Sequence, residues 1–284
     1  MNDGSHILLQ IADRLRQLKG RAAVVKLGGS AMEEPAATNG MLDAVAALHL
    51  LGVRLILVHG GGKPIDRAMD AAGLKPVKIQ GRRYTDEATL EIVVRVLVEI
   101  SDSLVAGFPE RGLDAACVSL GIAGKRLLLP GLDLQPLDLG RVGVISTVDR
   151  DIFQELFRVS ILPIVPSKAL DETDGGWLNV NADSMAAGLA RELEAKSVLF
   201  LTDTPGVLQD RRDPSSRLGR LTVAECRAFI DSGVIDGGMI PKVEACFEAL
   251  EAGAERAVIL DGRDPHSLLD DFLRPGSTGT EIVK

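Results

Sequence analysis

The stretch Arg54–Pro64, RLILVHGGGKP, decides the fold. Its first part, Arg54–His59, is a short run of branched aliphatic residues, which is typical of a strand buried on both faces. Three glycines follow, and the segment Pro64–Ala72 has the spacing of a helix. Ligands bind at the carboxyl ends of the strands in open α/β sheets. The sequence therefore predicts an α/β protein with a ligand site near His59.

The same alternation of short apolar strands and longer helical segments continues along the chain. Further strands are predicted at Ala22–Leu27, Ala115–Ser119, Ile161–Val165, Ser197–Leu201 and Arg256–Leu260. Further helices are predicted at Gly40–Leu51, Asp86–Gly107, Asp149–Val159, Ala182–Leu193, Thr222–Ser232 and Met239–Ala252. Turn-rich segments, expected to form hairpins and loops over the sheet, lie at Lys75–Arg83, Ala123–Val144, Ala169–Leu178 and Gln209–Gly219. This order predicts a three-layer α/β/α sandwich with a mostly parallel central sheet.

The composition excludes several classes of protein. The 284 residues carry a formal net charge of −8, so we expect no binding to nucleic acid. No run approaches 18 uncharged apolar residues, so no membrane span is predicted. The cysteines Cys117, Cys226 and Cys246 form no CxxC pair, which argues against a disulfide framework or a zinc knuckle. A reducing cytoplasm is the simplest location.

The first 20 residues are predicted to form an amphipathic helix. Its apolar positions recur at helical spacing and are Ile7, Leu8, Ile11, Leu15 and Leu18. Gly20 then ends it, as glycine often does at a helix C-terminus. Two interpretations remain open, because this helix can pack on its own domain or make contacts between subunits.

Two glycine clusters fall at predicted strand ends. One is Lys26–Ser30, KLGGS, and the other is His59–Lys63, HGGGK. Glycine lets backbone N–H groups approach an anion closely, and a following helix N-terminus adds partial positive charge. The alternative for each cluster is a tight turn. Two clusters at strand ends favour a cradle for one small anionic group.

Common catalytic motifs are missing from the sequence. It contains no GxxxxGK[ST] loop, no GxGxxG after a strand and no HExxH. The string at His59 resembles the oxyanion loop of esterases, but that chemistry needs a GxSxG nucleophile elbow, which is absent. Nicotinamide-dependent enzymes, hydrolases and zinc hydrolases are therefore disfavoured.

Two later segments add polar groups to the predicted site. Gly81–Asp86, GRRYTD, ends a hairpin and opens a helix, with Thr85 or Asp86 as its cap. An arginine there can grip a carboxylate with two hydrogen bonds, or it can be a solvated surface residue. Asn179–Asp183, NVNAD, places short polar side chains at alternate positions, and Asn181 can also cap the next helix.

A lysine near the start of the last long helix adds a local conflict. The segment Gly237–Lys242, GGMIPK, puts the cation of Lys242 at the positive end of that helix. This placement is unfavourable unless an anion lies nearby. A local conflict of this kind is typical of a functional site.

These motifs, in this order, resemble the N-acetylglutamate kinases of the amino-acid kinase superfamily. The resemblance covers Arg21–Lys284 and rests on KLGG at Lys26, HGGG at His59, GRRYTD at Gly81, NVNAD at Asn179, LTDTPGVL at Leu201, GGMIPKVEA at Gly237 and DGRDPHSLL at Asp261. It implies the amino-acid kinase fold and ATP-dependent phosphorylation of the side-chain carboxylate of N-acetyl-L-glutamate, the second step of arginine biosynthesis. It also implies an N-terminal helix (1–20), an amino-acid substrate lobe (21–174) and a nucleotide lobe (175–284).

The resemblance also implies a role for each matching position. Catalytic roles fall to Lys26, Lys242 and Asp183, where two lysines neutralise the transferring phosphoryl group and the aspartate holds them. Substrate binding falls to Gly61, Gly62, Arg83, Asn179 and Asn181. Nucleotide binding falls to Gly28, Gly29, Thr202, Asp203 and Met239. Mg²⁺ is expected to arrive with ATP, without a metal site on the protein.

The family also suggests partners and rivals. We expect a homo-oligomer, either a dimer or a hexamer joined through the N-terminal helix, with arginine as a feedback effector. Arg14 and Leu15 stand where the family typically has a Tyr-Ile pair. One alternative is a kinase of the same fold for an acetylated or carrier-linked α-aminoadipate in lysine biosynthesis. Another is a catalytically silent protein that senses arginine or binds a partner, against which the complete set of Lys26, Asp183 and Lys242 argues.

Overall fold

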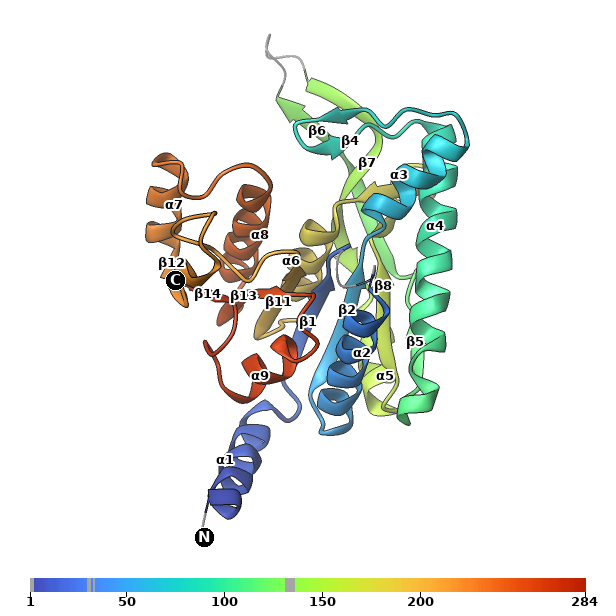
Figure 1. Ribbon diagram of the computed structural model, residues 1–284. Coiled ribbons are helices and arrows are strands. Elements are labelled where there is room, and N and C mark those ends of the chain that lie inside the picture. The colour runs from blue at the N-terminus through green and yellow to red at the C-terminus, as the bar shows by residue number, and fades with distance from the viewer. Residues whose placement is uncertain (1–2, 30–31, 33, 131–135) are drawn as a thin grey trace.

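The computed structural model describes residues 3–29, 32, 34–130 and 136–284 (Figure 1). The α-helices are α1 (Asp3–Leu18), α2 (Pro35–Leu50), α3 (Gly62–Ala71), α4 (Glu87–Ala106), α5 (Arg150–Arg158), α6 (Ala182–Glu192), α7 (Val223–Asp231), α8 (Ile240–Glu251) and α9 (Ser267–Leu273). The strands are β1 (Ala22–Leu27), β2 (Arg54–His59), β3 (Lys78–Ile79), β4 (Arg82–Arg83), β5 (Ala115–Cys117), β6 (Ile122–Pro130), β7 (Pro136–Val148), β8 (Leu162–Pro166), β9 (Lys168–Asp171), β10 (Trp177–Val180), β11 (Ser197–Thr202), β12 (Arg220–Thr222), β13 (Arg256–Asp261) and β14 (Thr280–Val283).

A single large sheet runs through the middle of the molecule. In the described residues its strand order is β12-β14-β13-β11-β1-β2-β8-β5. Every neighbouring pair is parallel except β13 and β14, which are antiparallel. The prediction of a mostly parallel sheet is confirmed. The glycines that follow β1 and β2 therefore lie side by side at one edge, because these two strands are direct neighbours in parallel register.

Helices cover both faces of this sheet. Val24 and Ile56 belong to a core shared with side chains of α5, α6, α7 and α8. Their chain neighbours Val25 and Leu57 pack on the opposite face with α2, α4 and α9. Successive side chains of a strand point to opposite faces, so a strand covered on both sides must be apolar throughout. This explains the uninterrupted aliphatic run in β2 and confirms the three-layer sandwich.

Smaller strand arrangements lie beyond the main sheet. β6, β7, β9 and β10 close into a small barrel, and β3 pairs with β4 in a hairpin. These strands fall in three of the four turn-rich segments, where hairpins were predicted. Asp86 caps α4, because its Oδ1 accepts a hydrogen bond from the backbone N–H of Thr89 at 2.8 Å. The predicted cap is confirmed as Asp86.

Some predicted boundaries are wrong. α2 begins at Pro35 instead of Gly40, because proline suits the first turn of a helix, where its missing N–H has no partner to lose. Gly40 lies inside α2, and a Cβ built there would come within 2.0 Å of the Cβ of Pro265. The glycine thus permits close packing and does not mark a helix end. The elements β12, α9 and β14 are short and were not predicted.

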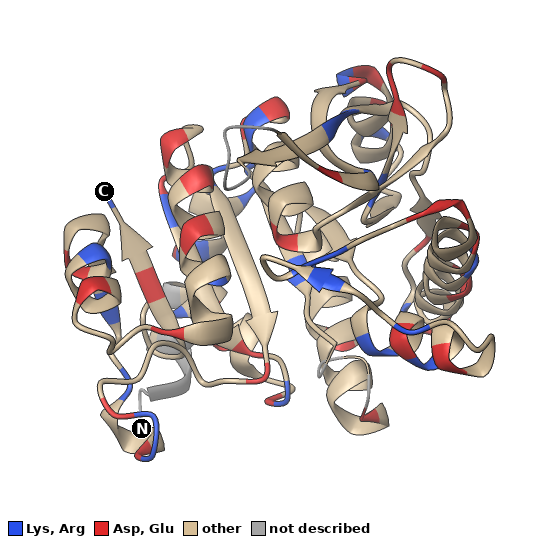
Figure 2. Ribbon diagram, turned by 90° about the horizontal axis from the view of Figure 1, so that it is seen from above, with Lys and Arg blue, Asp and Glu red and all other residues tan. Residues whose placement is uncertain are grey.

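The N-terminal helix lies at one end of the molecule, beside α9 (Figure 1). The Nε of Arg14 donates a hydrogen bond to the backbone oxygen of Phe272 at 2.9 Å, and Leu18 is buried. Leu8 and Leu9 are exposed. Figure 2 shows acidic and basic positions distributed over the whole molecule. In the described part of the chain, no helix has both the length and the apolar character to cross a membrane.

Candidate active site

A cavity of about 370 Å³ opens at the carboxyl ends of β1 and β2, and we call it the cleft. Its lining includes twelve of the thirteen predicted site residues, namely Lys26, Gly28, Gly29, Gly61, Gly62, Arg83, Asn179, Asn181, Asp183, Thr202, Asp203 and Lys242. These residues come from both ends of the chain, and the fold brings them to one place. Met239, the remaining predicted residue, lines an adjoining cavity of about 490 Å³. That cavity shares Asp203 and Lys242 with the cleft, so the two cavities are neighbours.

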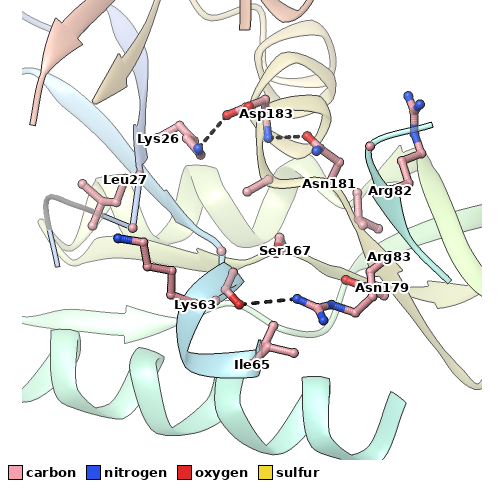
Figure 3. Close-up of a pocket in the computed structure, with 18 of the residues that line it drawn as sticks. Lys26, Leu27, Lys63, Ile65, Arg82, Arg83, Ser167, Asn179, Asn181 and Asp183 are labelled. Carbon is pink, nitrogen blue, oxygen red and sulfur yellow. Dashed lines mark hydrogen bonds and ion pairs between the residues drawn. The ribbon is translucent and has the colours of Figure 1, made fainter. Parts of the chain in front are cut away.

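Two lysines meet one aspartate on the wall of the cleft. The Nζ of Lys26, on β1, lies 2.7 Å from Oδ1 of Asp183 in the first turn of α6 (Figure 3). The Nζ of Lys242, in the first turn of α8, lies 4.0 Å from Oδ2 of the same carboxylate. Lys26 and Asp183 are 7 % and 8 % exposed. A buried charge is tolerated when it is paired, and the shared aspartate pairs two cations at once.

The two lysines keep Asp183 ionised. Burial alone would raise the pKa of its carboxyl group, but attraction from Lys26 and Lys242, together with the hydrogen bond from Lys26, outweighs burial and lowers this pKa. Asn181 fixes the backbone at the start of α6, because its Oδ1 accepts hydrogen bonds from the backbone N–H groups of Asp183 and Ser184 at 2.8 and 3.1 Å. Asn181 is thus the N-cap of α6 as well as a residue of the cleft wall.

The glycines of the two loops differ in what surrounds them. A Cβ built on Gly28 would lie 2.4 Å from the backbone oxygen of Leu201, which accepts a hydrogen bond from the N–H of Gly28. Packing against β11 therefore demands a glycine there. A Cβ on Gly29 or Gly62 would meet nothing within 4 Å. The protein itself leaves open space at these two positions, which face the cleft.

Arg83 is held inside the cleft and is not a solvated surface residue. Its side chain is 9 % exposed, and its Nη2 lies 2.6 Å from Oδ1 of Asp66 on α3. Nη2 also donates to the backbone oxygen of Gly62 at 3.4 Å, and Nη1 to the Sδ of Met69 at 3.1 Å. The planar guanidinium has five N–H donors, so it retains donors for a ligand carboxylate.

The amino acid kinase family matches residues 21–261. An acetylglutamate kinase of Brachyspira hyodysenteriae is 36 % identical over 99 % of this chain and 97 % of its own length. The chain belongs to the amino acid kinase family. Within this family it lies among the acetylglutamate kinases.

Solved structures show the same fold for this amino acid kinase. N-acetylglutamate synthase from Neisseria gonorrhoeae, complexed with coenzyme A and N-acetyl-glutamate, matches with a TM-score of 0.85 at 22 % identity. The match covers 99 % of this chain and 63 % of the synthase. Carbamate kinase from Giardia lamblia bound to AMP-PNP matches with a TM-score of 0.66 at 17 % identity, over 93 % of this chain and 99 % of that one. At these identities the matches establish the fold alone.

A buried threonine connects two predicted substrate residues of this family member. Thr85 is fully buried, and its Oγ1 accepts a hydrogen bond from Nδ2 of Asn179 at 3.0 Å. The same hydroxyl donates to the backbone oxygen of Arg83 at 2.9 Å. The sequence predicts only a capping role for Thr85. Its partner lies 94 positions away, so no local pattern signals the contact.

A buried histidine forms a hydrogen bond to the backbone of the glycine loop Gly60–Gly62. His59 is fully buried, with its Nδ1 3.2 Å from the backbone oxygen of Gly60 and its Nε2 2.8 Å from Oγ of Ser101. A carbonyl oxygen only accepts, so Nδ1 carries the hydrogen and Nε2 accepts from the hydroxyl. Burial lowers the pKa of His59 to about 4, against a weaker opposing effect of the Gly60 hydrogen bond. The ring is neutral at pH 7 and anchors the loop by hydrogen bonds.

Proposed function

We propose that this protein uses ATP to phosphorylate the side-chain carboxylate of N-acetyl-L-glutamate, giving N-acetyl-L-glutamyl 5-phosphate in the second step of arginine biosynthesis. Membership of the amino acid kinase family and 36 % identity to an acetylglutamate kinase over nearly the whole chain support this function. The observation that carries it is the meeting of Lys26, Asp183 and Lys242 on one cleft wall, between two glycine loops.

The chemistry needs positioning and positive charge more than covalent help. An oxygen of the substrate carboxylate attacks the γ-phosphorus, the bond to the bridging oxygen breaks, and ADP leaves with that electron pair. The attacking carboxylate is already ionised at neutral pH, so no general base is required. Negative charge spreads over the oxygens of the transferring group, and Lys26 and Lys242 neutralise it from fixed positions. Asp183 reduces the repulsion between the two cations and fixes their geometry.

The remaining residues divide between the two substrates. Arg83 and Asn179 bind the α-carboxylate and the acetylamino group, while the N–H groups of Gly61 and Gly62 and the cleft-lining Asn181 complete the substrate site. Gly28 and Gly29 contact the phosphates. The adjoining cavity, which is lined by Met239 and Asp203, accommodates the nucleoside part of ATP, and Thr202 contacts the nucleotide from the cleft. The open space at Gly29 and Gly62 supports these assignments, since a close backbone approach to an anion requires it.

Magnesium is proposed to enter with ATP. Among the described residues, no group of three or more histidine, cysteine, aspartate or glutamate side chains could hold a metal ion, and Asp183 is engaged by two lysines. We therefore propose that phosphate oxygens and water supply most of the ligands of the ion, as they often do for Mg²⁺. The ion would supply additional positive charge at the β- and γ-phosphates.

A coupled assay of ADP formation tests the function. Purified protein with Mg-ATP is expected to release ADP only when N-acetyl-L-glutamate is added, and much faster than with N-acetyl-α-aminoadipate. Higher kcat/KM with the aminoadipate compound would assign the protein to the longer substrate. The absence of ADP release with both acceptors, from protein that binds ATP, would favour the silent sensing protein.

We further propose a lobe boundary, an assembly, an effector and a location for this protein. The substrate lobe (21–174) and nucleotide lobe (175–284) meet in the loop between β9 and β10. Assembly is proposed as a dimer, or as a hexamer through α1, whose Leu8 and Leu9 are exposed. Light scattering of the full chain and of a chain lacking residues 1–20 would decide between them. Arginine as an effector is tested by its effect on ADP release, and a cytoplasmic location by cell fractionation.

A further inference from the structure

Lys63 brings another ammonium group to the cleft. It is the second residue of α3 and directly follows the loop Gly60–Gly62. It lines the cleft together with Gly28, Gly29 and Lys26. Figure 3 shows its side chain extending from α3 towards Leu27, where β1 ends. Lys63 therefore reaches the same loop that is proposed to hold the phosphates.

The cleft is strongly basic although the chain as a whole is acidic. Its described lining has six basic side chains, Lys26, Lys63, Lys78, Arg82, Arg83 and Lys242, and three acidic ones, Asp66, Asp183 and Asp203. Two of the acids are committed to other cations, Asp183 to Lys26 and Lys242, and Asp66 to Arg83. A surplus of positive charge in a protein of net charge −8 indicates a site for polyanions.

The position of Lys63 singles out the terminal phosphate. Lys26 points away from the end of β1 towards Asp183, whereas Lys63 approaches that end from α3 (Figure 3). Gly29 and Gly62 both leave open space in this region. A phosphoryl group on the Gly28–Gly29 loop would have Lys26 on one side and Lys63 on another. The nucleoside cavity at Met239 has Lys242 in its lining but not Lys63.

We propose that Lys63 is a third cation that contacts the γ-phosphoryl group of ATP and stabilises it during transfer. The proposal rests on the proposed function and adds a residue to its machinery. The transferring group carries negative charge on three equatorial oxygens. A third cation from a separate helix can therefore neutralise the negative charge that Lys26 and Lys242 do not. Lys63 is exposed, so its replacement should leave the fold intact.

Three variants of the full chain test this role. Lys63→Ala removes the charge and Lys63→Arg retains it. Arg67→Ala is the matched control, because Arg67 is exposed on the same helix one turn later and does not line the cleft. Calorimetry in the presence of Mg²⁺ gives the Kd of the protein for AMP-PNP and for ADP. The coupled assay gives kcat and the KM for each substrate.

For Lys63→Ala we expect the Kd for AMP-PNP to rise about tenfold, as for loss of one charged hydrogen bond, with the Kd for ADP unchanged. We expect kcat to fall at least tenfold, Lys63→Arg to recover part of both losses, and Arg67→Ala to match the wild type. Equal losses for AMP-PNP and ADP, a change only in the KM for N-acetyl-L-glutamate, or no difference from Arg67→Ala would each overturn the proposal. A wild-type protein that releases no ADP would reject the proposed function instead, and the AMP-PNP comparison would still decide the role of Lys63.

Discussion

Arg83 and Asp66 form an ion pair inside the cleft, with 2.6 Å between Nη2 and Oδ1. The aspartate comes from α3 and the arginine from β4, so this pair ties the β3–β4 hairpin to the helix that follows the glycine loop. The guanidinium is therefore oriented before any substrate arrives. A preoriented group loses less entropy on binding than a mobile one.

Replacement of Arg83 by lysine is expected to weaken binding of N-acetyl-L-glutamate. Lysine keeps the charge but lacks the planar fork that can hold Asp66 on one edge and a carboxylate on another. We expect the KM for this substrate to rise about tenfold or more, with little change in the KM for ATP. Asp66→Asn should give a smaller rise in the same constant. Steady-state kinetics with each substrate varied in turn provides the measurement, and an unchanged KM in Arg83→Lys would remove Arg83 from the substrate site.

Loss of either lysine beside Asp183 should slow turnover strongly. For Lys26→Ala and Lys242→Ala we expect kcat to fall on the order of 10²–10³-fold, as for loss of one preorganised stabilising donor. Lys26→Ala should also lower the melting temperature more than Lys242→Ala, because it removes the partner at 2.7 Å and leaves a buried carboxylate with one cation at 4.0 Å. Turnover near the wild-type rate in either folded variant would refute the assigned role.

Two glycine-to-alanine changes should separate packing from binding. Gly28→Ala forces a Cβ to within 2.4 Å of the Leu201 oxygen, so we expect a loss of stability of about 1–3 kcal/mol. Gly62→Ala places its Cβ in open space, so its unfolding free energy should stay near that of the wild type while substrate binding weakens. Urea unfolding and KM measurements on both variants give the comparison. A Gly62→Ala protein with unaltered kinetics would mean that no ligand approaches that residue.

The buried ring of His59 predicts a loss of stability in acid. Its pKa is about 4 in the folded protein and about 6.5 when exposed, so the unfolded chain binds the proton first as pH falls. The stabilising contribution is complete above pH 6.5 and declines between pH 6.5 and 4. From pH 7 to 5 we expect a loss of about 2 kcal/mol in the unfolding free energy. The variant His59→Gln should lack this part of the pH dependence, and equal slopes in urea titrations of the two proteins would contradict the assignment.

The order of strands and helices could be predicted because each element has a local sequence pattern. The aliphatic run of β2 predicts a strand, and the position of Asp86 just before α4 predicts a helix cap. The cleft residues could be predicted because each sits at a strand end or helix start that carries a recognisable motif. Gly40 misled the prediction of α2, since the contact that requires a glycine there comes from Pro265, far along the chain.

Contacts between distant segments could not be predicted in this way. Asn179 meets Thr85, and His59 meets Ser101, only after β10 and α4 have taken their places in the fold. Asp66 resembles any polar residue in the first turns of a surface helix, although it pairs with Arg83. The partners of these side chains are set by tertiary packing, which leaves no periodic trace in the sequence.

The sharing of Asp183 between Lys26 and Lys242 has a consequence for the newly made chain. The ribosome releases Lys26 first, Asp183 much later, and Lys242 on α8 later still. Until that helix emerges, the nascent polypeptide lacks one of the two cations that pair with Asp183. The charge balance around this carboxylate is thereby completed only after α8 has been translated.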